Sequence, residues 1–323
     1  MTRPRIAFVG RAVHEKTRSD RFLMDILSEV ADLKMFRREA MNGAELVEAI
    51  NRFNPDQTLF FQLPPSISNH LLPIKSKNFV WVPMWDGFKK LGLRRRLFFR
   101  YFRVRSLCFS HSTFKYVRNI GQNALHVRCY PRPEIAARTF RDKPPYTLFL
   151  WQRTPQLGVD EVVQIVGREN IAKIILKSDF DVTTNPAVEL QRIPEWLPEN
   201  EYKAMFNQID YYVAPRFQEG IGFSFLEALS RGIPVIGHDE ATMNEYIVDG
   251  QNSLLFDDRF QLKSGLVSPA RLRPALIADM NEGHQHWLKA IPSVQAFILG
   301  NKPATSGCSN SSYPPLSALE TRT

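Results

Sequence analysis

Residues 211–237 constrain the fold of this chain more than any other segment. An apolar run over 210–214 predicts a buried strand. Gly220 and Gly222 then permit a tight turn and a close approach of the backbone to a ligand. From Phe223 onward the apolar residues fit one face of a helix, which a Gly-x-Pro sequence ends before the next strand. Such short connections predict a parallel βαβ unit.

The loop of this unit has the chemistry of a binding site, because ligands sit at the carboxyl ends of parallel strands. The free amides of Gly222, Phe223 and Ser224 at the helix start favour an anion such as a phosphate. One turn into the helix, Glu227 could accept hydrogen bonds from a ribose diol. In the loop, Glu219 could bind sugar hydroxyls or steady positive charge on an anomeric carbon. The alternative is that both glutamates are solvated surface residues.

About sixty residues, 197–257, resemble the donor-binding half of glycosyltransferase family 4, whose members are retaining enzymes of the GT-B fold. The resemblance rests on the spacing Glu-x7-Glu of Glu219 and Glu227, on the Gly-x-Pro-Val strand at 232–235, and on the stretch 245–252. It implies an α/β protein in which two Rossmann-like domains face each other across a cleft. It also implies retention of anomeric configuration, with no metal and no other cofactor.

Length and composition agree with two domains. The 323 residues, 44% hydrophobic and 23% charged, are typical of a soluble globular protein. We expect an acceptor-binding domain at 1–140, a nucleotide-sugar donor-binding domain at 146–270, C-terminal helices at 271–300 with a break near Pro292, and a disordered tail at 301–323. The three cysteines have no metal-site spacing, and the chain has no signal-peptide layout or membrane span. A cytoplasmic protein is therefore expected.

Further donor contacts follow from the resemblance. The family holds the donor diphosphate with an arginine and a lysine after the first strand of the second domain. Arg153 fits the arginine, whereas the lysine is missing. Lys177 is a possible substitute, or a solvated lysine. Glu245 matches a family glutamate near the end of the donor site, with a surface helix residue as the alternative.

The acceptor side is less distinctive. The family often has a histidine after a central strand of the first domain; here that histidine is absent and Asp86 follows the strand. Asp86 could bind acceptor hydroxyls or act as a catalytic base, or it could belong to an Asp-Gly turn. His14, Glu15 and Arg18 follow the first strand and are candidate acceptor contacts.

A basic stretch accounts for most of the formal net charge of +9. Between Lys89 and Arg105 the sequence holds eight cations and no acid, with aromatic residues interleaved. A basic aromatic helix suits the surface of an anionic membrane. The alternative is a helix packed by its aromatics with a solvated basic face. Nucleic-acid binding is not expected, because no recognition motif accompanies the charge.

These features predict a glycosyltransferase that moves a sugar from a nucleotide-diphosphate sugar to a glycan or lipid-linked acceptor, in polysaccharide or glycoconjugate biosynthesis. It would work in the cytoplasm, with peripheral attachment to the inner face of the membrane through the basic stretch. Two alternatives stay open. One is a GT-B sugar-nucleotide epimerase or phosphorylase, and the other is a catalytically silent membrane- or partner-binding module.

Overall fold

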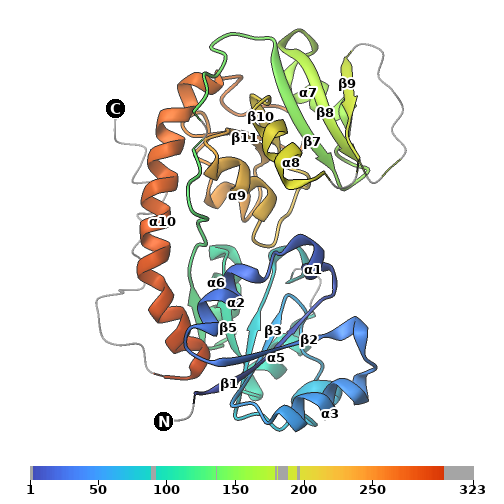
Figure 1. Ribbon diagram of the computed structural model, residues 1–323, viewed down its shortest axis with the longest axis vertical. Coiled ribbons are helices and arrows are strands. Elements are labelled where there is room, and N and C mark those ends of the chain that lie inside the picture. Colours follow the sequence, from blue (N-terminus) through green and yellow to red (C-terminus); the bar gives the residue numbers. More distant parts are fainter. Residues whose placement is uncertain are drawn as a thin grey trace.

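The computed structural model describes residues 3–88, 92–135, 137–178, 180, 188–194 and 197–301, without the side chains of 93–96 and 199. Two six-stranded parallel sheets lie one above the other in Figure 1, with orders β2-β1-β3-β4-β5-β6 and β12-β11-β10-β7-β8-β9. The predicted α/β architecture of two Rossmann-like halves is therefore confirmed.

The strands of the first sheet are β1 (Arg5–Gly10), β2 (Asp32–Arg37), β3 (Gln57–Phe61), β4 (Asn78–Val82), β5 (Arg105–Cys108) and β6 (Ala124–His126). Those of the second are β7 (Tyr146–Gln152), β8 (Ile171–Ser178), β9 (Glu189–Arg192), β10 (Tyr211–Val213), β11 (Val235–His238) and β12 (Leu254–Phe256). The expected strand at 210–214 becomes β10, and the following one begins at Val235.

The helices are α1 (Val13–Thr17), α2 (Arg21–Ser28), α3 (Gly43–Phe53), α4 (Trp85–Phe88), α5 (Leu93–Tyr101), α6 (His111–Asn119), α7 (Val159–Val166), α8 (Glu199–Phe206), α9 (Phe223–Ser230) and α10 (Pro269–Leu299). Short turns of helix are η1 (Arg38–Ala40), η2 (Ile67–Leu71), η3 (Arg168–Asn170) and η4 (Met243–Glu245). No helix among the described residues is both long enough and apolar enough to span a bilayer.

Both faces of the first sheet are buried, as its apolar strands require. Alternate residues of β1 enter different cores: Ile6 and Phe8 pack with α2 and α10, whereas Ala7 and Val9 pack with α3. The first of these cores continues into the second domain. Phe22 of α2 lies 4.9 Å from Phe223 of α9, measured between ring centroids. The two domains thus share apolar contacts beside the space between their sheets.

Helix α10 runs along one side of both domains (Figure 1). Our expectation of a break near Pro292 was wrong, because α10 is one helix through Pro274 and Pro292. Buried side chains on either side of Pro292, including Trp287 and Val294, hold both halves in place. Its final carbonyls accept hydrogen bonds from the first domain, including Leu299 O from Gln57 Nε2 at 3.1 Å. Packing therefore offsets the amide that proline lacks.

Two sequence expectations fall on residues that are not described. Of the predicted disordered tail, residues 302–323 lie outside the described residues. Of the basic stretch, residues 89–91 and the side chains of 93–96 also lie outside them. The remainder of that stretch includes the second half of α5 and the start of β5.

Candidate active site

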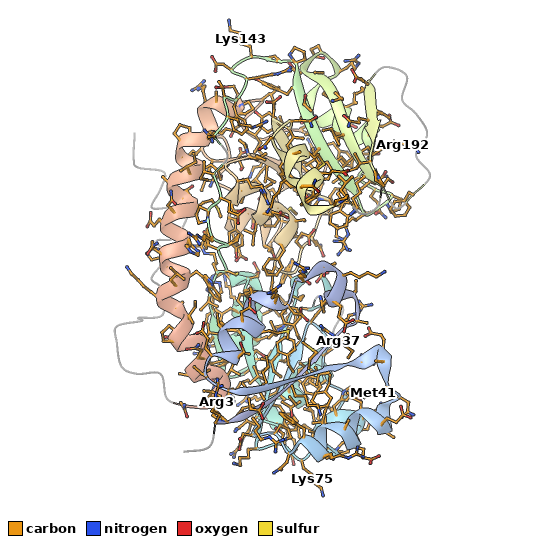
Figure 2. All side chains as sticks on the ribbon, in the orientation of Figure 1. Arg3, Arg37, Met41, Lys75, Lys143 and Arg192 are labelled. Atoms are coloured by element: carbon orange, nitrogen blue, oxygen red, sulfur yellow. The ribbon has the colours of Figure 1, made fainter. Side chains whose placement is uncertain are left out.

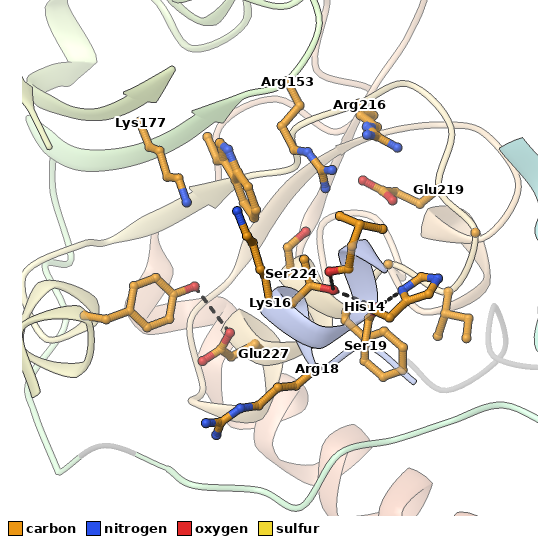
Figure 3. A pocket seen from close by; sticks show the side chains of 18 of the residues that line it. His14, Lys16, Arg18, Ser19, Arg153, Lys177, Arg216, Glu219, Ser224 and Glu227 are labelled. Atoms are coloured by element: carbon orange, nitrogen blue, oxygen red, sulfur yellow. Dashed lines mark hydrogen bonds between the residues drawn. The ribbon is translucent and has the colours of Figure 1, made fainter. Parts of the chain in front are cut away.

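A cavity of about 780 Å³ lies between the two domains. Its walls are formed where strands end: the β1–α1 segment and the β4–α4 connection on one side, and the ends of β7 and β8, the loop after β10 and the start of α9 on the other. This is the expected place for a ligand in parallel sheets. Figure 3 shows charged side chains entering the cavity from both domains.

The loop between β10 and α9 depends on its glycines. Gly222, the N-cap of α9, has φ 81°, and a Cβ there would lie 1.9 Å from Phe225 Cε1. A Cβ on Gly220 would lie 2.9 Å from Met84 of the first domain. Only glycine fits at Gly222, and the cavity is lined next to it by Phe223 and Ser224. The first amides of α9, which have no partner within the helix, therefore lie at the cavity.

Glu219 is the most perturbed carboxylate of the cavity. Its side chain is only 7% exposed, and its Oε1 has no hydrogen-bond partner among the described residues. Burial raises the pKa of Glu219 to about 7, against the opposing charges of Arg216 and Arg153. The pKa of this buried carboxylate is therefore close to neutral pH, and a carboxylate perturbed in this way at a cleft is typical of a functional group.

Thr242 holds the loop that carries Glu219. Its hydroxyl donates to the carbonyl oxygen of Glu219 at 2.8 Å and lies 3.3 Å from that of Gly220. Thr242 is fully buried and has φ 81° and ψ −57°. A β-branched residue in this region is strained. The side chain of Thr242 thus anchors the loop at the cost of an unfavourable backbone.

Glu227 lies one turn into α9 and lines the same cavity. Its Oε2 accepts from the Tyr202 hydroxyl at 3.3 Å, and its Oε1 accepts from Arg231 Nη2 at 3.1 Å. These two partners orient a carboxylate that is still partly exposed, with about a third of its side chain accessible (36%). It can accept further hydrogen bonds from a ligand.

Two cations stand at the ends of adjacent strands and lie over the same aromatic ring. The Arg153 guanidinium lies 4.6 Å from the Trp151 ring centroid, and Lys177 Nζ lies 4.0 Å from it. Lys177 is 7% exposed, so it is not the solvated lysine of the alternative interpretation. Both residues line the cavity, where they can receive an anion.

Asp86 and His14 line the cavity from the first domain. An oxygen of Asp86 lies 3.6 Å from Nη1 of Arg216 in the second domain. The other oxygen accepts from the Gly87 amide at 2.9 Å, so the Asp-Gly turn also forms. His14 is buried, and its Nδ1 lies 2.6 Å from Ser19 Oγ. Burial lowers the pKa of His14, which keeps the ring neutral at pH 7.

Glu15 and Glu245, which we expected at acceptor and donor, do not line the cavity. Glu15 Oε1 accepts at 3.0 Å from Arg37, which Figure 2 labels on the first domain. Glu245 is buried between the domains and accepts from the backbone amides of His111 and Ser112, at 2.6 and 3.1 Å. It caps α6 of the other domain. This geometry favours a structural role for Glu245 between the domains over the predicted contact with the donor.

The sequence interpretation missed several residues that shape this site: Lys16, Trp151, Tyr202, Arg216, Arg231 and Thr242. Arg216 carried a usable signal, because it lies three residues after the end of β10, at the carboxyl end of the sheet. Lys16 carried the same signal as His14 and Arg18, because it also follows β1, and Trp151 lies near the end of β7, two residues before Arg153. Tyr202, Arg231 and Thr242 give no comparable signal in the sequence. Among the described residues, no three His, Cys, Asp or Glu side chains gather as a metal site would require.

Residues 189–264 match the family described as "Glycosyl transferases group 1". This segment includes β9 to β12, the glycine loop and α9. The match supports the coarser part of the resemblance, a GT-B glycosyltransferase of group 1. No curated protein matches the chain in sequence.

Several solved structures are similar in fold at low sequence identity. TarM is 13% identical with a TM-score of 0.58, covering 80% of this chain and 57% of that chain. A sucrose-phosphate synthase from Thermosynechococcus elongatus is 11% identical with a TM-score of 0.61, covering 92% and 98%. HepE from Anabaena, solved in complex with UDP, is 10% identical with a TM-score of 0.56, covering 92% and 99%. The chain thus spans little more than half of TarM but nearly the whole of the other two.

The two sheets and the cleft between them are the GT-B arrangement that these structural neighbours share. The group 1 match falls on the domain that contributes Glu219, Glu227 and the α9 start. This chain therefore has the GT-B fold, and residues 189–264 of its second domain are similar to the glycosyl transferases of group 1.

Proposed function

We propose that this chain transfers a sugar from a nucleoside-diphosphate sugar to a glycan or lipid-linked acceptor, with retention of configuration and without a metal ion. The observation that carries the proposal is the buried Glu219 carboxylate, whose Oε1 has no hydrogen-bond partner among the described residues, in the cavity that Arg153 and the start of α9 also line. A carboxylate can stabilise positive charge on a sugar, and nearby cations and helix amides can stabilise a diphosphate, so this arrangement suits a reaction that separates the two.

The donor would be held mainly by the second domain. Arg153, Lys177 and the amides at Phe223 and Ser224 would bind the diphosphate, since each supplies positive charge or a free donor at the same wall. Glu227 would accept the hydroxyl hydrogens of the ribose. The UDP bound to the Anabaena relative gives further support to a nucleotide in this cleft.

During transfer, the bond between the anomeric carbon and the diphosphate oxygen breaks, and a bond to the acceptor hydroxyl oxygen forms. Arg153 and the α9 start would stabilise the charge on the leaving diphosphate. Glu219 would stabilise positive charge on the sugar. Asp86 would accept a hydrogen bond from the acceptor hydroxyl and take up its proton as the new bond forms. The Arg216–Asp86 pair joins the two walls and favours a closed cleft that excludes water.

We also propose that the basic stretch, residues 89–105, binds the surface of an anionic membrane. In the described part of α5, Leu97, Phe98 and Tyr101 are exposed, at 48%, 43% and 78%. Exposed apolar and aromatic side chains beside cations suit a membrane interface. Sedimentation with vesicles of phosphatidylcholine containing phosphatidylglycerol tests this proposal. Binding that persists unchanged in a Phe98→Ser/Tyr101→Ser variant would count against it.

The proposed activity is tested by incubating the protein with a panel of nucleoside-diphosphate sugars, with and without Mg²⁺, and identifying the products. Transfer to an acceptor, or slow hydrolysis to sugar and nucleotide, is expected for the wild type and lost in Glu219→Ala. A Glu189→Ala variant is the control, because Glu189 is exposed on β9 and outside the cavity. A new nucleotide-sugar without acceptor would instead identify an epimerase, and dependence on inorganic phosphate a phosphorylase.

A further inference from the structure

Two side chains from different elements hold the two oxygens of the Glu227 carboxylate. Tyr202 of α8 donates its hydroxyl to Oε2 at 3.3 Å, a hydrogen bond that Figure 3 draws as a dashed line. Arg231, the C-cap of α9, donates from Nη2 to Oε1 at 3.1 Å. Burial raises the pKa of Tyr202, so its hydroxyl stays protonated and remains a donor. Each oxygen therefore has one protein donor.

One buried ring fixes both of these donors. Phe206 is 1% exposed, and the Tyr202 ring meets it edge-on at 4.9 Å between centroids. The Arg231 guanidinium lies 5.1 Å from the same centroid, and this side chain is only 14% exposed. Nη1 of Arg231 also lies 3.8 Å from a carboxylate oxygen of Glu134, in the segment that joins the domains. The two donors are thus restricted before any ligand arrives, and they restrict the Glu227 carboxylate in turn.

The carboxylate still has acceptor capacity on both oxygens. An ionised carboxyl group offers about four lone-pair sites, and Tyr202 and Arg231 use one on each oxygen of Glu227. The side chain of Glu227 is 36% exposed and lines the cavity, so the remaining sites are open to a ligand. Two neighbouring hydroxyls, such as those of a ribose, can donate one hydrogen bond to each oxygen. Holding the acceptor in place beforehand lowers the entropy cost of binding both hydroxyls.

Tyr202 and Arg231 differ in what else they contribute. Arg231 brings a positive charge that offsets the charge of Glu227, in a cavity where the donor diphosphate is also proposed to bind. Tyr202 brings no charge. Removal of the tyrosine hydroxyl therefore tests the orientation of the carboxylate alone, whereas removal of the arginine tests orientation and charge together.

We propose that Tyr202 and Arg231 are positioning residues that set the preference of the site for ribonucleotides over deoxyribonucleotides, because they hold Glu227 ready for both ribose hydroxyls. This inference rests on the proposed function, which assigns Glu227 to the ribose. A purely structural role of either residue would lower the affinity for both kinds of nucleotide alike. A positioning role lowers the affinity mainly for the ribonucleotide.

The test is calorimetry with UDP, GDP and ADP and with their 2′-deoxy counterparts. The variants are Tyr202→Phe, which keeps the ring against Phe206, and Arg231→Met, which keeps an apolar stem there. The control is Tyr101→Phe, which removes the hydroxyl of an exposed tyrosine outside the cavity. Glu227→Ala, alone and combined with Tyr202→Phe, shows whether Tyr202 acts through Glu227.

For a nucleotide that binds the wild type, we expect the wild type and the control to bind its 2′-deoxy form about tenfold more weakly. Tyr202→Phe should reduce this ratio to about threefold, mainly by weakening the ribonucleotide. Arg231→Met should reduce the ratio too and weaken both forms. In the Glu227→Ala background, Tyr202→Phe should have no further effect.

Three results would overturn the inference while nucleotide binding persists. They are a wild type without preference for the ribonucleotide, a ratio that Tyr202→Phe leaves unchanged, and an effect of Tyr202→Phe that persists without Glu227. Binding of no nucleotide by the wild type would overturn the proposed function and this inference together, so the two failures are distinguishable.

Discussion

Replacing Glu219 with glutamine should make the protein more stable, and increasingly so as the pH rises. Burial holds the pKa of Glu219 at about 7, against its ordinary value of 4.5. In the unfolded chain the carboxyl group ionises near the ordinary value. Folding therefore favours the protonated form, and between these two pH values the folded protein binds more protons than the unfolded one. Over this range the free energy of unfolding must fall as the pH rises.

The size of the effect follows from the difference between the two pKa values. Each pH unit corresponds to roughly 1.36 kcal/mol, so ionisation of Glu219 should destabilise the fold by about 3 kcal/mol above pH 7. The effect should be nearly absent below pH 4.5. Glutamine has the same shape and no charge, so Glu219→Gln should remove this dependence. A difference in hydrogen bonding between the glutamine and the protonated glutamate shifts the free energy of unfolding by the same amount at every pH. It therefore does not affect the trend of the difference between variant and wild type with pH.

The assay is urea unfolding of the wild type and Glu219→Gln at several pH values from 4.5 to 8.5, with Glu189→Gln as the exposed control. The free energy gained by Glu219→Gln should grow up to pH 7 and then stay level. A gain that does not vary with pH, or that shrinks as the pH rises, would refute the reasoning that Glu219 is buried without a compensating partner. The control should show no such trend.

Three further substitutions test individual parts of the site. Thr242→Gly should change the free energy of unfolding by no more than about 1 kcal/mol from the wild type, because relief of a strained backbone offsets a lost hydrogen bond. The same change should slow sugar transfer about tenfold, because it frees the loop that carries Glu219. Equal transfer rates in variant and wild type would show that the hydroxyl does not position this loop. Gly222→Ala should lower the free energy of unfolding, measured by urea denaturation, by more than about 2 kcal/mol, since the new Cβ would overlap the Phe225 ring. It should also abolish nucleotide binding. Glu245→Ala should cost about 2 kcal/mol of stability by uncapping α6, while nucleotide affinity measured by calorimetry stays unchanged; a lower affinity would return Glu245 to the donor site.

The sequence predicted the parts of the site that local pattern determines. The apolar run, the two glycines and the helical periodicity identified β10, the loop and α9, and they placed Glu219 and Glu227 at one cavity. These features depend on backbone geometry within about thirty residues. The glycine that adopts φ 81° and the start of the helix after it can both be predicted from the local sequence, without knowing what packs against them.

Contacts between the domains could not be read from local pattern. The Arg216–Asp86 pair, and the capping of α6 by Glu245, join residues more than a hundred positions apart. Their formation depends on how the two sheets are placed against each other. Helix α10 illustrates the same limit, because its continuity through Pro292 comes from buried side chains that pack against both domains.

The central claim, a nucleoside-diphosphate sugar bound between the domains, is tested most directly by thermal unfolding with a panel of nucleotides and nucleotide-sugars. A ligand that binds only the folded protein raises the unfolding midpoint in proportion to its occupancy. We predict a rise with one nucleotide and its sugar conjugate, reduced in Glu227→Ala and retained in Glu189→Ala. No rise with any member of the panel, or a rise that Glu227→Ala leaves unchanged, would contradict the account.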